Sequence, residues 1–170
     1  MKHVIIGAGP AGVIAAETLR KGDANAEIQM IGGEPEPPYS SMAIPYLLEK
    51  NIDEGGTYLR KNAGHYDDLS IQYSHGRVES IAAGDNALTL EGGDKVAYDR
   101  LLVATGARPM KLPVPGMDLA GVHNCWTLED ARAIAKLATE GANVVLIGAG
   151  FIGCIILESL MKLAGNLSVV

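Results

Sequence analysis

The feature that most constrains this chain is a short apolar strand pattern that runs into three glycines and then into a helical pattern. Near the start, H-V-I-I-G-A-G-P-A-G places Gly7, Gly9 and Gly12 in that order. The first glycine permits a tight turn, the second lets a pyrophosphate approach the backbone, and the third lets the helix pack closely on the strand. The phosphates are expected at the positive end of this helix. A single G-x-G-x-x-G pattern remains a weak signal, because glycine turns precede many helices.

The same pattern returns 141 positions later as V-V-L-I-G-A-G-F-I-G, with Gly148, Gly150 and Gly153. Seven further side chains recur at this offset: Val4, Ile6, Ala8, Ile14, Glu17, Leu19 and Lys21. Packing alone does not explain two such units in one chain. Two units predict two bound dinucleotides, and the simplest chemistry that uses both is hydride transfer from a nicotinamide to a flavin.

The order of the expected elements predicts an α/β fold. A strand at 4–6, a helix at 10–20 and a strand at 27–31 form a β-α-β unit. Further alternating segments, separated by the turns at 84–86 and 92–94, predict strands and an antiparallel insert: 69–73, 77–81, 87–90 and 95–98. The continuous apolar run at 101–104 predicts a strand buried on both faces, ending at Thr105-Gly106. We expect two Rossmann-like, three-layer units, the first with the antiparallel insert and the second incomplete.

Two segments between these strands carry further expectations. The proline-rich loop at 35–45 is stiff and suits either a ligand-lining role or a plain surface connection, and a helical run follows at 46–50. A later helix begins at Thr127 with Asp130 in a capping-box position, and its apolar face includes Ala131, Ile134 and Leu137 before Gly141 ends it.

Composition excludes several classes of function. The net charge of −6, without a cluster of Lys and Arg, argues against a nucleic-acid partner. No apolar segment reaches the roughly 20 residues that span a bilayer, so we expect no membrane insertion. Cys125 and Cys154 form no C-x-x-C pair, which favours a reducing cytoplasm and two buried small side chains. His65 and His75 are isolated in the sequence and predict surface side chains.

A dinucleotide site of this type needs an acid about 20 residues beyond its last glycine, to bind the ribose hydroxyls. The first carboxylate after the second strand is Glu34, which follows Gly32 and Gly33. We assign the ribose role to Glu34, and the alternative is an exposed loop acid with no ligand.

Longer motifs give a resemblance to the flavin-dependent pyridine nucleotide-disulfide oxidoreductase superfamily. They are V-I-I-G-A-G-P-A-G, P-P-Y-S-S-M-A-I-P-Y, Y-D-R-L-L-V-A-T-G-A-R-P, T-L-E-D-A-R-A-I and V-V-L-I-G-A-G-F-I-G. The resemblance implies an FAD-binding segment at 1–109, a linker at 110–121 and the start of an NAD(P)H-binding domain at 122–170. The residues that it implies for FAD are Gly7, Gly9, Pro10, Ala11, Gly12, Glu34, Ser41, Met42, Val78, Ala104, Thr105 and Gly106. Those that it implies for NAD(P)H are Gly148, Gly150, Phe151, Ile152 and Gly153.

Departures from the family pattern narrow the expected chemistry. Met42 stands where many relatives carry a redox cysteine, and a thioether forms neither a thiolate nor a disulfide. The C-x-x-x-x-C pair of dithiol reductases is also absent. The chain therefore resembles cysteine-free reductases that pass electrons to a redox protein or a small molecule, and we assign no acid–base residue. The alternatives are an oxidase or peroxidase without the cysteine, and a catalytically silent flavin-binding subunit of a larger complex.

By the same resemblance, the chain corresponds to an N-terminal portion of such an enzyme. The second strand of the NAD(P)H domain only begins at 167–170, and Ile155 stands where many relatives hold a carboxylate. The residue that selects NAD or NADP is expected after Val170. We expect the isolated portion to leave apolar sheet uncovered, and the complete protein to be a possible homodimer.

Overall fold

A computed structural model describes all 170 residues, which form two compact units. The first unit contains Met1–Ser40 and Tyr58–Ala107, and the second contains Ser41–Thr57 and Arg108–Val170. This grouping differs from a contiguous division of the chain, because Ser41–Thr57 makes its contacts within the second unit.

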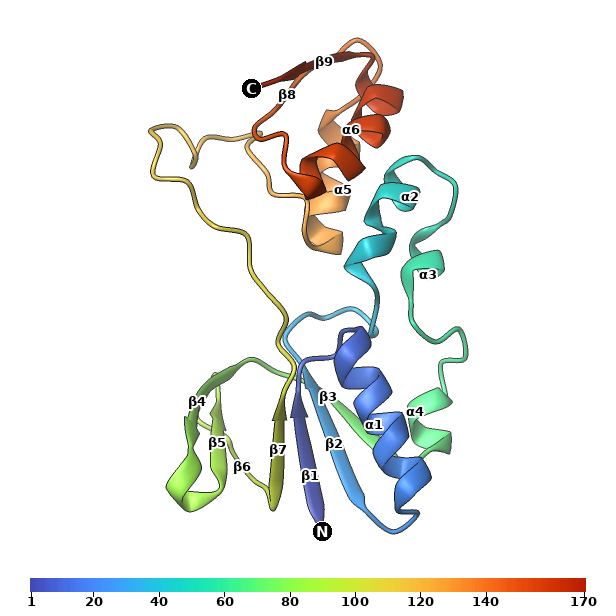
Figure 1. Cartoon of the computed structure of the whole chain (residues 1–170), viewed down its shortest axis with the longest axis vertical. Helices are drawn as coiled ribbons and strands as arrows, with labels where there is room; N and C mark the ends of the chain where they lie inside the picture. The colour runs from blue at the N-terminus through green and yellow to red at the C-terminus, as the bar shows by residue number, and fades with distance from the viewer. The chain divides into compact units, whose positions relative to one another are not determined.

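The first unit is built on a parallel sheet of four strands. These are β1 (Lys2–Ile6), β2 (Glu27–Gly32), β3 (Ile71–His75) and β7 (Arg100–Val103), in the order β3-β2-β1-β7. In the register of the sheet, Ile5 lies opposite Met30 on one side and Leu102 on the other. Helix α1 (Pro10–Gly22) connects β1 to β2, and Figure 1 shows it beside these two strands. The carboxyl ends of all four strands therefore meet at one edge, where the glycine turn lies.

Alternate residues of β1 and β2 enter two different cores. On one face, Ile5, Ile28 and Met30 pack with Val13 and Ala16 of α1. On the other face, Val4, Ile6 and Ile31 pack against Leu88 of the antiparallel insert. The insert consists of β4 (Val78–Ala82), η2 (Ala83–Asp85), β5 (Ala87–Leu90) and β6 (Lys95–Ala97). The unit thus has a helix layer, a parallel sheet and an antiparallel layer, which confirms the predicted α/β class.

Strand β7 is less buried than its apolar sequence predicted. Leu102 is 41% exposed and Val103 is 56% exposed, so the expectation of burial on both faces was wrong. The physical reason is topology: β7 is the edge strand of the sheet, and no strand pairs with its outer side. Next to it, an apolar groove of about 460 Å³ runs between β1, β7 and α1, lined in part by Ile14 and Leu101.

The second unit contains one β-α-β element and several packed helices. Strands β8 (Asn143–Leu146) and β9 (Asn166–Val169) are parallel, and α6 (Phe151–Ala164) connects them. The remaining elements are η1 (Ser41–Ala43), α2 (Ile44–Leu48), α3 (Glu54–Thr57) and α5 (Leu128–Leu137). Helix α2 begins two residues before the expected position, because Pro45 is compatible with a first helical turn.

Helix α5 begins as predicted and ends early. The Thr127 hydroxyl accepts from the Asp130 amide at 3.1 Å, and the Asp130 carboxylate accepts from the Thr127 amide at 2.9 Å, which completes a capping box. The helix stops at Leu137 rather than at Gly141, and Leu137 is 52% exposed, so its predicted place in the apolar face was wrong. Ala131 is buried and Ile134 packs against the Leu146 cluster, as predicted, and Leu128 is buried beside them.

Neither cysteine is fully buried as predicted, because Cys125 is partly buried and Cys154 is exposed. Burial raises the pKa of the Cys125 thiol to about 11, and the nearby Asp130 carboxylate adds to this shift. Cys154 is exposed on α6, so its predicted burial was wrong. The helical position of Cys154 is on the side that faces away from the cluster of Leu146, Ile156 and Leu160. None of the helices combines the length and the apolar character that crossing a membrane requires.

Candidate functional site

The first glycine turn lies at the carboxyl edge of the parallel sheet. Gly7 has a φ of +113°, and its amide donates to the Ile31 carbonyl at 2.8 Å, which ties the turn to the end of β2. A Cβ on Gly7 would overlap the Ala104 carbonyl oxygen. The position is therefore restricted to glycine both by its backbone conformation and by its neighbour.

The next two glycines shape the start of α1. Gly9 is the N-cap in an extended conformation, with φ −77° and ψ −176°, and a Cβ there would meet nothing within 4 Å. A Cβ on Gly12 would overlap the Gly7 carbonyl oxygen, so helix and turn are in backbone contact. Pro10 occupies the first turn, and no acidic residue does. An open N-cap, free helix amides and a first turn without an acidic residue fit a pyrophosphate.

Two other predicted segments reach the same edge of the first unit. The Ala104 amide donates to the Ile6 carbonyl at 2.8 Å, so the Ala104-Thr105-Gly106 turn lies against Gly7. The Gly76 amide donates to the Gly32 carbonyl at 2.8 Å, which brings the start of β4 and hence Val78 toward the end of β2. The first glycine turn, the Ala104-Thr105-Gly106 turn and the beginning of the antiparallel insert therefore all lie in the first unit.

Glu34 lies two residues beyond β2 and is partly buried. Its carboxylate Oε2 accepts a hydrogen bond from the Tyr39 hydroxyl at 2.6 Å. Glu34 is thus not a fully exposed loop acid, and it follows the strand whose Ile31 carbonyl binds Gly7. Tyr39 was not among the predicted site residues, although its place in P-P-Y-S-S-M lies within the proline-rich loop.

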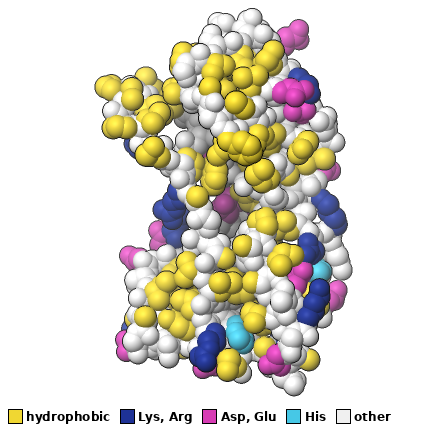
Figure 2. Space-filling model, viewed as in Figure 1, with side chains coloured by type: hydrophobic (Ala, Val, Ile, Leu, Met, Phe, Trp, Pro, Cys, Tyr) yellow, Lys and Arg dark blue, Asp and Glu magenta, His cyan; other side chains and the backbone are white.

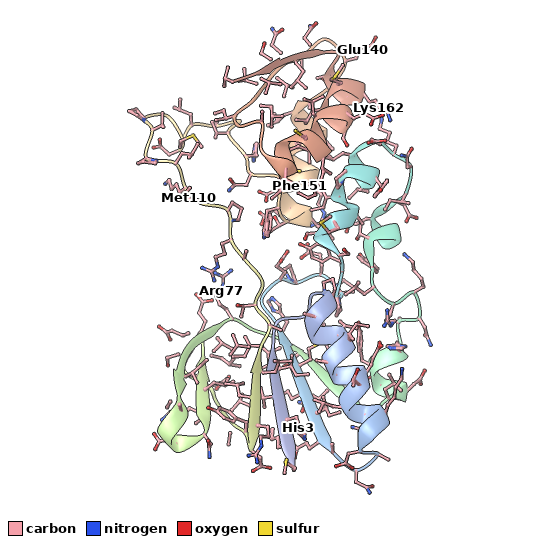
Figure 3. All side chains as sticks on the ribbon, in the orientation of Figure 1. His3, Arg77, Met110, Glu140, Phe151 and Lys162 are labelled. Atoms are coloured by element: carbon pink, nitrogen blue, oxygen red, sulfur yellow. The ribbon has the colours of Figure 1, made fainter.

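The second glycine turn repeats the geometry of the first. Gly148 has a φ of +96°, and Gly150 is an extended N-cap with φ −74° and ψ −176°. A Cβ on Gly153 would overlap the Gly148 carbonyl oxygen, just as a Cβ on Gly12 would overlap the Gly7 carbonyl oxygen. The first turn of α6 carries no acidic residue, and Phe151 at its start is 79% exposed (Figure 3). Hydrophobic side chains reach the surface over this unit (Figure 2), and they include Val145, Ile147 and Ile152.

The remaining predicted residues, Ser41 and Met42, lie in η1 and group with the second unit. Met42 is 65% exposed. Their role at a flavin stays a prediction.

Sequence reasoning also missed a polar cluster on α1. Glu17 accepts from the Arg60 guanidinium at 2.7 and 2.6 Å, and His65 Nε2 lies 2.8 Å from Glu17 Oε1. His65 is therefore partly buried and in contact with the Glu17–Arg60 ion pair rather than isolated on the surface. The hydrogen bonds from Arg60 lower the pKa of Glu17, and the His65 contact acts in the same direction against the effect of burial.

A family model described as pyridine nucleotide-disulphide oxidoreductase matches residues 1–170. The chain belongs to this family. It is similar to the rhodocoxin reductase of Rhodococcus erythropolis, with 35% identity over a 172-residue alignment that includes 100% of this chain and 40% of the relative. It is also similar to an NADH oxidase of Methanocaldococcus jannaschii, with 35% identity over 161 residues, 90% of this chain and 36% of the relative.

Among solved structures, this member of the family resembles a chain of the covalent putidaredoxin reductase–putidaredoxin complex. The TM-score is 0.87 at 30% identity, over 99% of this chain and 41% of that chain. The likeness extends over both glycine turns and confirms the Rossmann-like architecture. The chain spans about two fifths of the length of the curated relatives that it matches.

Proposed function

We propose that this chain is part of an FAD-dependent NAD(P)H oxidoreductase that transfers hydride from NAD(P)H to flavin and electrons on to an acceptor. The observation that carries the proposal is the second glycine turn, in which the first two glycines have backbone angles close to those of the first turn and the third glycine approaches the carbonyl of the first in the same way. Two turns of the same geometry fit two dinucleotides, and a protein with only a binding role needs one. We assign residues 1–109 to FAD, with Ser41–Thr57 as an insertion, 110–121 to the linker and 122–170 to NAD(P)H.

The chain contributes binding and orientation in this scheme. When bound, FAD accepts hydride from the nicotinamide and passes electrons to the acceptor. Gly9 and the first amides of α1 would hold the FAD pyrophosphate, and Gly150 with the first amides of α6 would hold that of NAD(P)H. Orientation of the two rings then supplies most of the catalysis, and no side chain needs to act as an acid or base.

We propose a reaction without a redox-active thiol. Met42 has no thiol at the family's redox position. The Cys125 thiol, with its pKa of about 11, is protonated at neutral pH and therefore a poor nucleophile. The acceptor is then a redox protein of the ferredoxin or rubredoxin type or a small molecule. The two free thiols are compatible with a reducing cytoplasm, which we propose as the location of the protein. The proposal includes NADPH as well as NADH as the hydride donor. It also includes a homodimer of the complete protein.

Anaerobic reduction tests the proposal directly. The full-length, FAD-loaded protein is mixed with NADH or with NADPH in the absence of oxygen, and the flavin absorbance is followed. We expect bleaching with at least one nucleotide. Absence of bleaching with both would overturn the hydride-transfer proposal.

The similarity to an NADH oxidase favours a second candidate, in which oxygen is the acceptor. The reduced protein distinguishes the two when it is reoxidised in parallel by air and by an oxidised iron-sulfur protein. Faster reoxidation by the iron-sulfur protein supports the reductase, and faster reoxidation by air supports the oxidase.

A further inference from the structure

The carboxylate that we assign to the FAD ribose is held by a neighbouring phenol. Tyr39 Oη donates to Glu34 Oε2 at 2.6 Å, which is the length typical of a charge-assisted hydrogen bond from a hydroxyl to a carboxylate. The contact uses one oxygen of Glu34 and fixes the direction of the carboxylate plane. Because a free glutamate side chain samples several rotamers, this bond reduces the conformational freedom that ligand binding would otherwise remove.

The backbone of Tyr39 is itself anchored within the first unit. Tyr39 forms a β-bridge with Tyr58, and the Leu59 amide donates to the Pro38 carbonyl at 2.9 Å. The loop before it contains Pro35, Pro37 and Pro38, each with a restricted φ. The phenol therefore projects from a fixed backbone rather than from a free loop.

A second tyrosine supports the other side of the same loop. Tyr73 lies on β3, and its hydroxyl donates to the Glu36 carbonyl at 3.1 Å. Burial raises the pKa of Tyr73, with the Glu34 and Glu36 carboxylates adding to the shift, so this phenol stays protonated and able to donate. A Cβ on Gly32 would lie 2.6 Å from Tyr73 Oη and 3.1 Å from Ala8 Cβ. The Tyr73 phenol and Ala8 of the first glycine turn therefore both lie close to Gly32.

We propose that Tyr39 is a positioning residue for the ribose-binding carboxylate of the FAD site. Its phenol engages Glu34 Oε2 and leaves Oε1 for the vicinal hydroxyls of the adenosine ribose. Tyr73 holds the Glu36 carbonyl, so the Glu34 loop is fixed at both ends. The proposal rests on the assignment of Glu34 to FAD under the proposed function.

The test compares FAD affinity in full-length protein that carries Tyr39→Phe, which removes one hydroxyl and keeps the ring. FAD dissociation is measured by the recovery of flavin fluorescence on dilution of the loaded protein. We expect Kd to rise about tenfold, equivalent to about 1.4 kcal/mol. Tyr98→Phe is the matched control, because Tyr98 packs in the same unit and its hydroxyl makes no hydrogen bond, and we expect its Kd to stay unchanged.

A double-mutant cycle separates positioning from a general structural role. Glu34→Ala should weaken FAD binding more than Tyr39→Phe, and Tyr39→Phe should have no further effect in the Glu34→Ala background. If Tyr39→Phe weakens FAD binding equally in both backgrounds, Tyr39 does not act through Glu34 and the inference is overturned. Circular dichroism of the apoproteins checks that each variant is folded.

Two further outcomes separate this inference from the assignment on which it rests. If Glu34→Ala weakens FAD binding and Tyr39→Phe does not, the Glu34 assignment stands and the role of Tyr39 is wrong. If Glu34→Ala leaves the FAD affinity unchanged, the ribose assignment is wrong, and the inference is overturned with it.

Discussion

Glu17 links three segments of the first unit through its two carboxylate oxygens. Glu17 lies on α1, and Arg60 lies near the start of the Tyr58–Ala107 part of this unit. His65 is the first residue of α4 (His65–Asp68). The Glu17 side chain is only 11% exposed, so its ion pair with Arg60 and its contact with His65 compensate for the loss of hydration. Tyr66 lies beside this cluster, with its buried hydroxyl lacking a hydrogen-bond partner.

We predict that Glu17→Gln lowers the free energy of unfolding by about 2 kcal/mol at neutral pH, because it removes hydrogen bonds between charged groups. The lowered pKa of Glu17 means that this stabilisation is present above the ordinary carboxyl pKa of 4.5 and is lost as the pH falls through the lower, folded-state pKa. Urea unfolding between pH 3 and pH 7 should therefore show a smaller acid dependence in the variant.

Tyr66→Phe is the matched control for this measurement. It removes a buried hydroxyl that has no hydrogen-bond partner, so we expect no loss of stability. An equal loss of stability in both variants would assign the effect to general packing rather than to the ion pairs.

At the residue scale, sequence reasoning reached the glycines and missed the side chains that contact one another across the fold. Gly7 and Gly12 are predictable because their neighbours are close in sequence or are backbone atoms of the same motif. The partner of Glu17 lies 43 positions away, and no local pattern indicates it. Tyr39 is only five positions from Glu34, but the direction of its phenol depends on the bridge to Tyr58.

At the element scale, α6 and α2 are joined by a buried hydroxyl. Ser159 is fully buried in α6, and its Oγ lies 3.2 Å from the Pro45 carbonyl and 3.0 Å from Glu49 Oε1. Its single proton serves one of these acceptors at a time. Lys162, on the last turn of α6 (Figure 3), donates to Glu49 Oε2 at 2.8 Å, and this contact with that of Ser159 lowers the pKa of Glu49. These contacts join the Ser41–Thr57 segment to the helix that begins at the second glycine turn.

We predict that Ser159→Ala lowers the free energy of unfolding of the second unit by about 1 kcal/mol, through loss of the hydrogen bond. Ser159→Val should cost more, about 1–3 kcal/mol, because the fully buried site has no room for a larger side chain. Hydrogen exchange should become faster at the α2 amides in both variants. Ser168→Ala, at an exposed serine of β9, is the control and should leave the α2 exchange rates unchanged. Unchanged α2 exchange in Ser159→Val would show that α2 is held independently of α6.

Whether each long segment forms a helix or a strand could be predicted from the sequence, but how deeply it is buried could not. The β-α-β pattern and the Thr127 capping box depend on residues within a few positions of one another, and both predictions were confirmed. The apolar run of β7 is compatible with a central or an edge strand, because strand order is set by pairing with β1 across almost 100 residues. The grouping of Ser41–Thr57 with α5 and α6 likewise depends on contacts more than 70 positions apart, such as that of Arg132 with Glu54.

At the scale of the whole molecule, the two units carry the same turn and are proposed to bind different dinucleotides. In each unit the third glycine touches the carbonyl of the first, so an added methyl group has to displace the helix N-terminus from the turn. The surroundings differ, because a Cβ on Gly7 would meet Ala104, whereas one on Gly148 would meet nothing within 4 Å. The same substitution in the two turns therefore tests whether their binding roles are separate.

We predict that Gly12→Ala lowers FAD retention at least tenfold, because the methyl group overlaps the Gly7 carbonyl oxygen beside the proposed pyrophosphate site. Gly153→Ala should keep a full complement of FAD and raise KM for NADH about tenfold, because only the second turn is distorted. Flavin content by absorbance and steady-state kinetics of the full-length protein give both values. Gly22→Ala, at the end of α1 where a Cβ meets nothing within 4 Å, should change neither. Loss of FAD from Gly153→Ala with an unaltered KM in the remaining loaded enzyme would contradict the assignment of one dinucleotide to each turn.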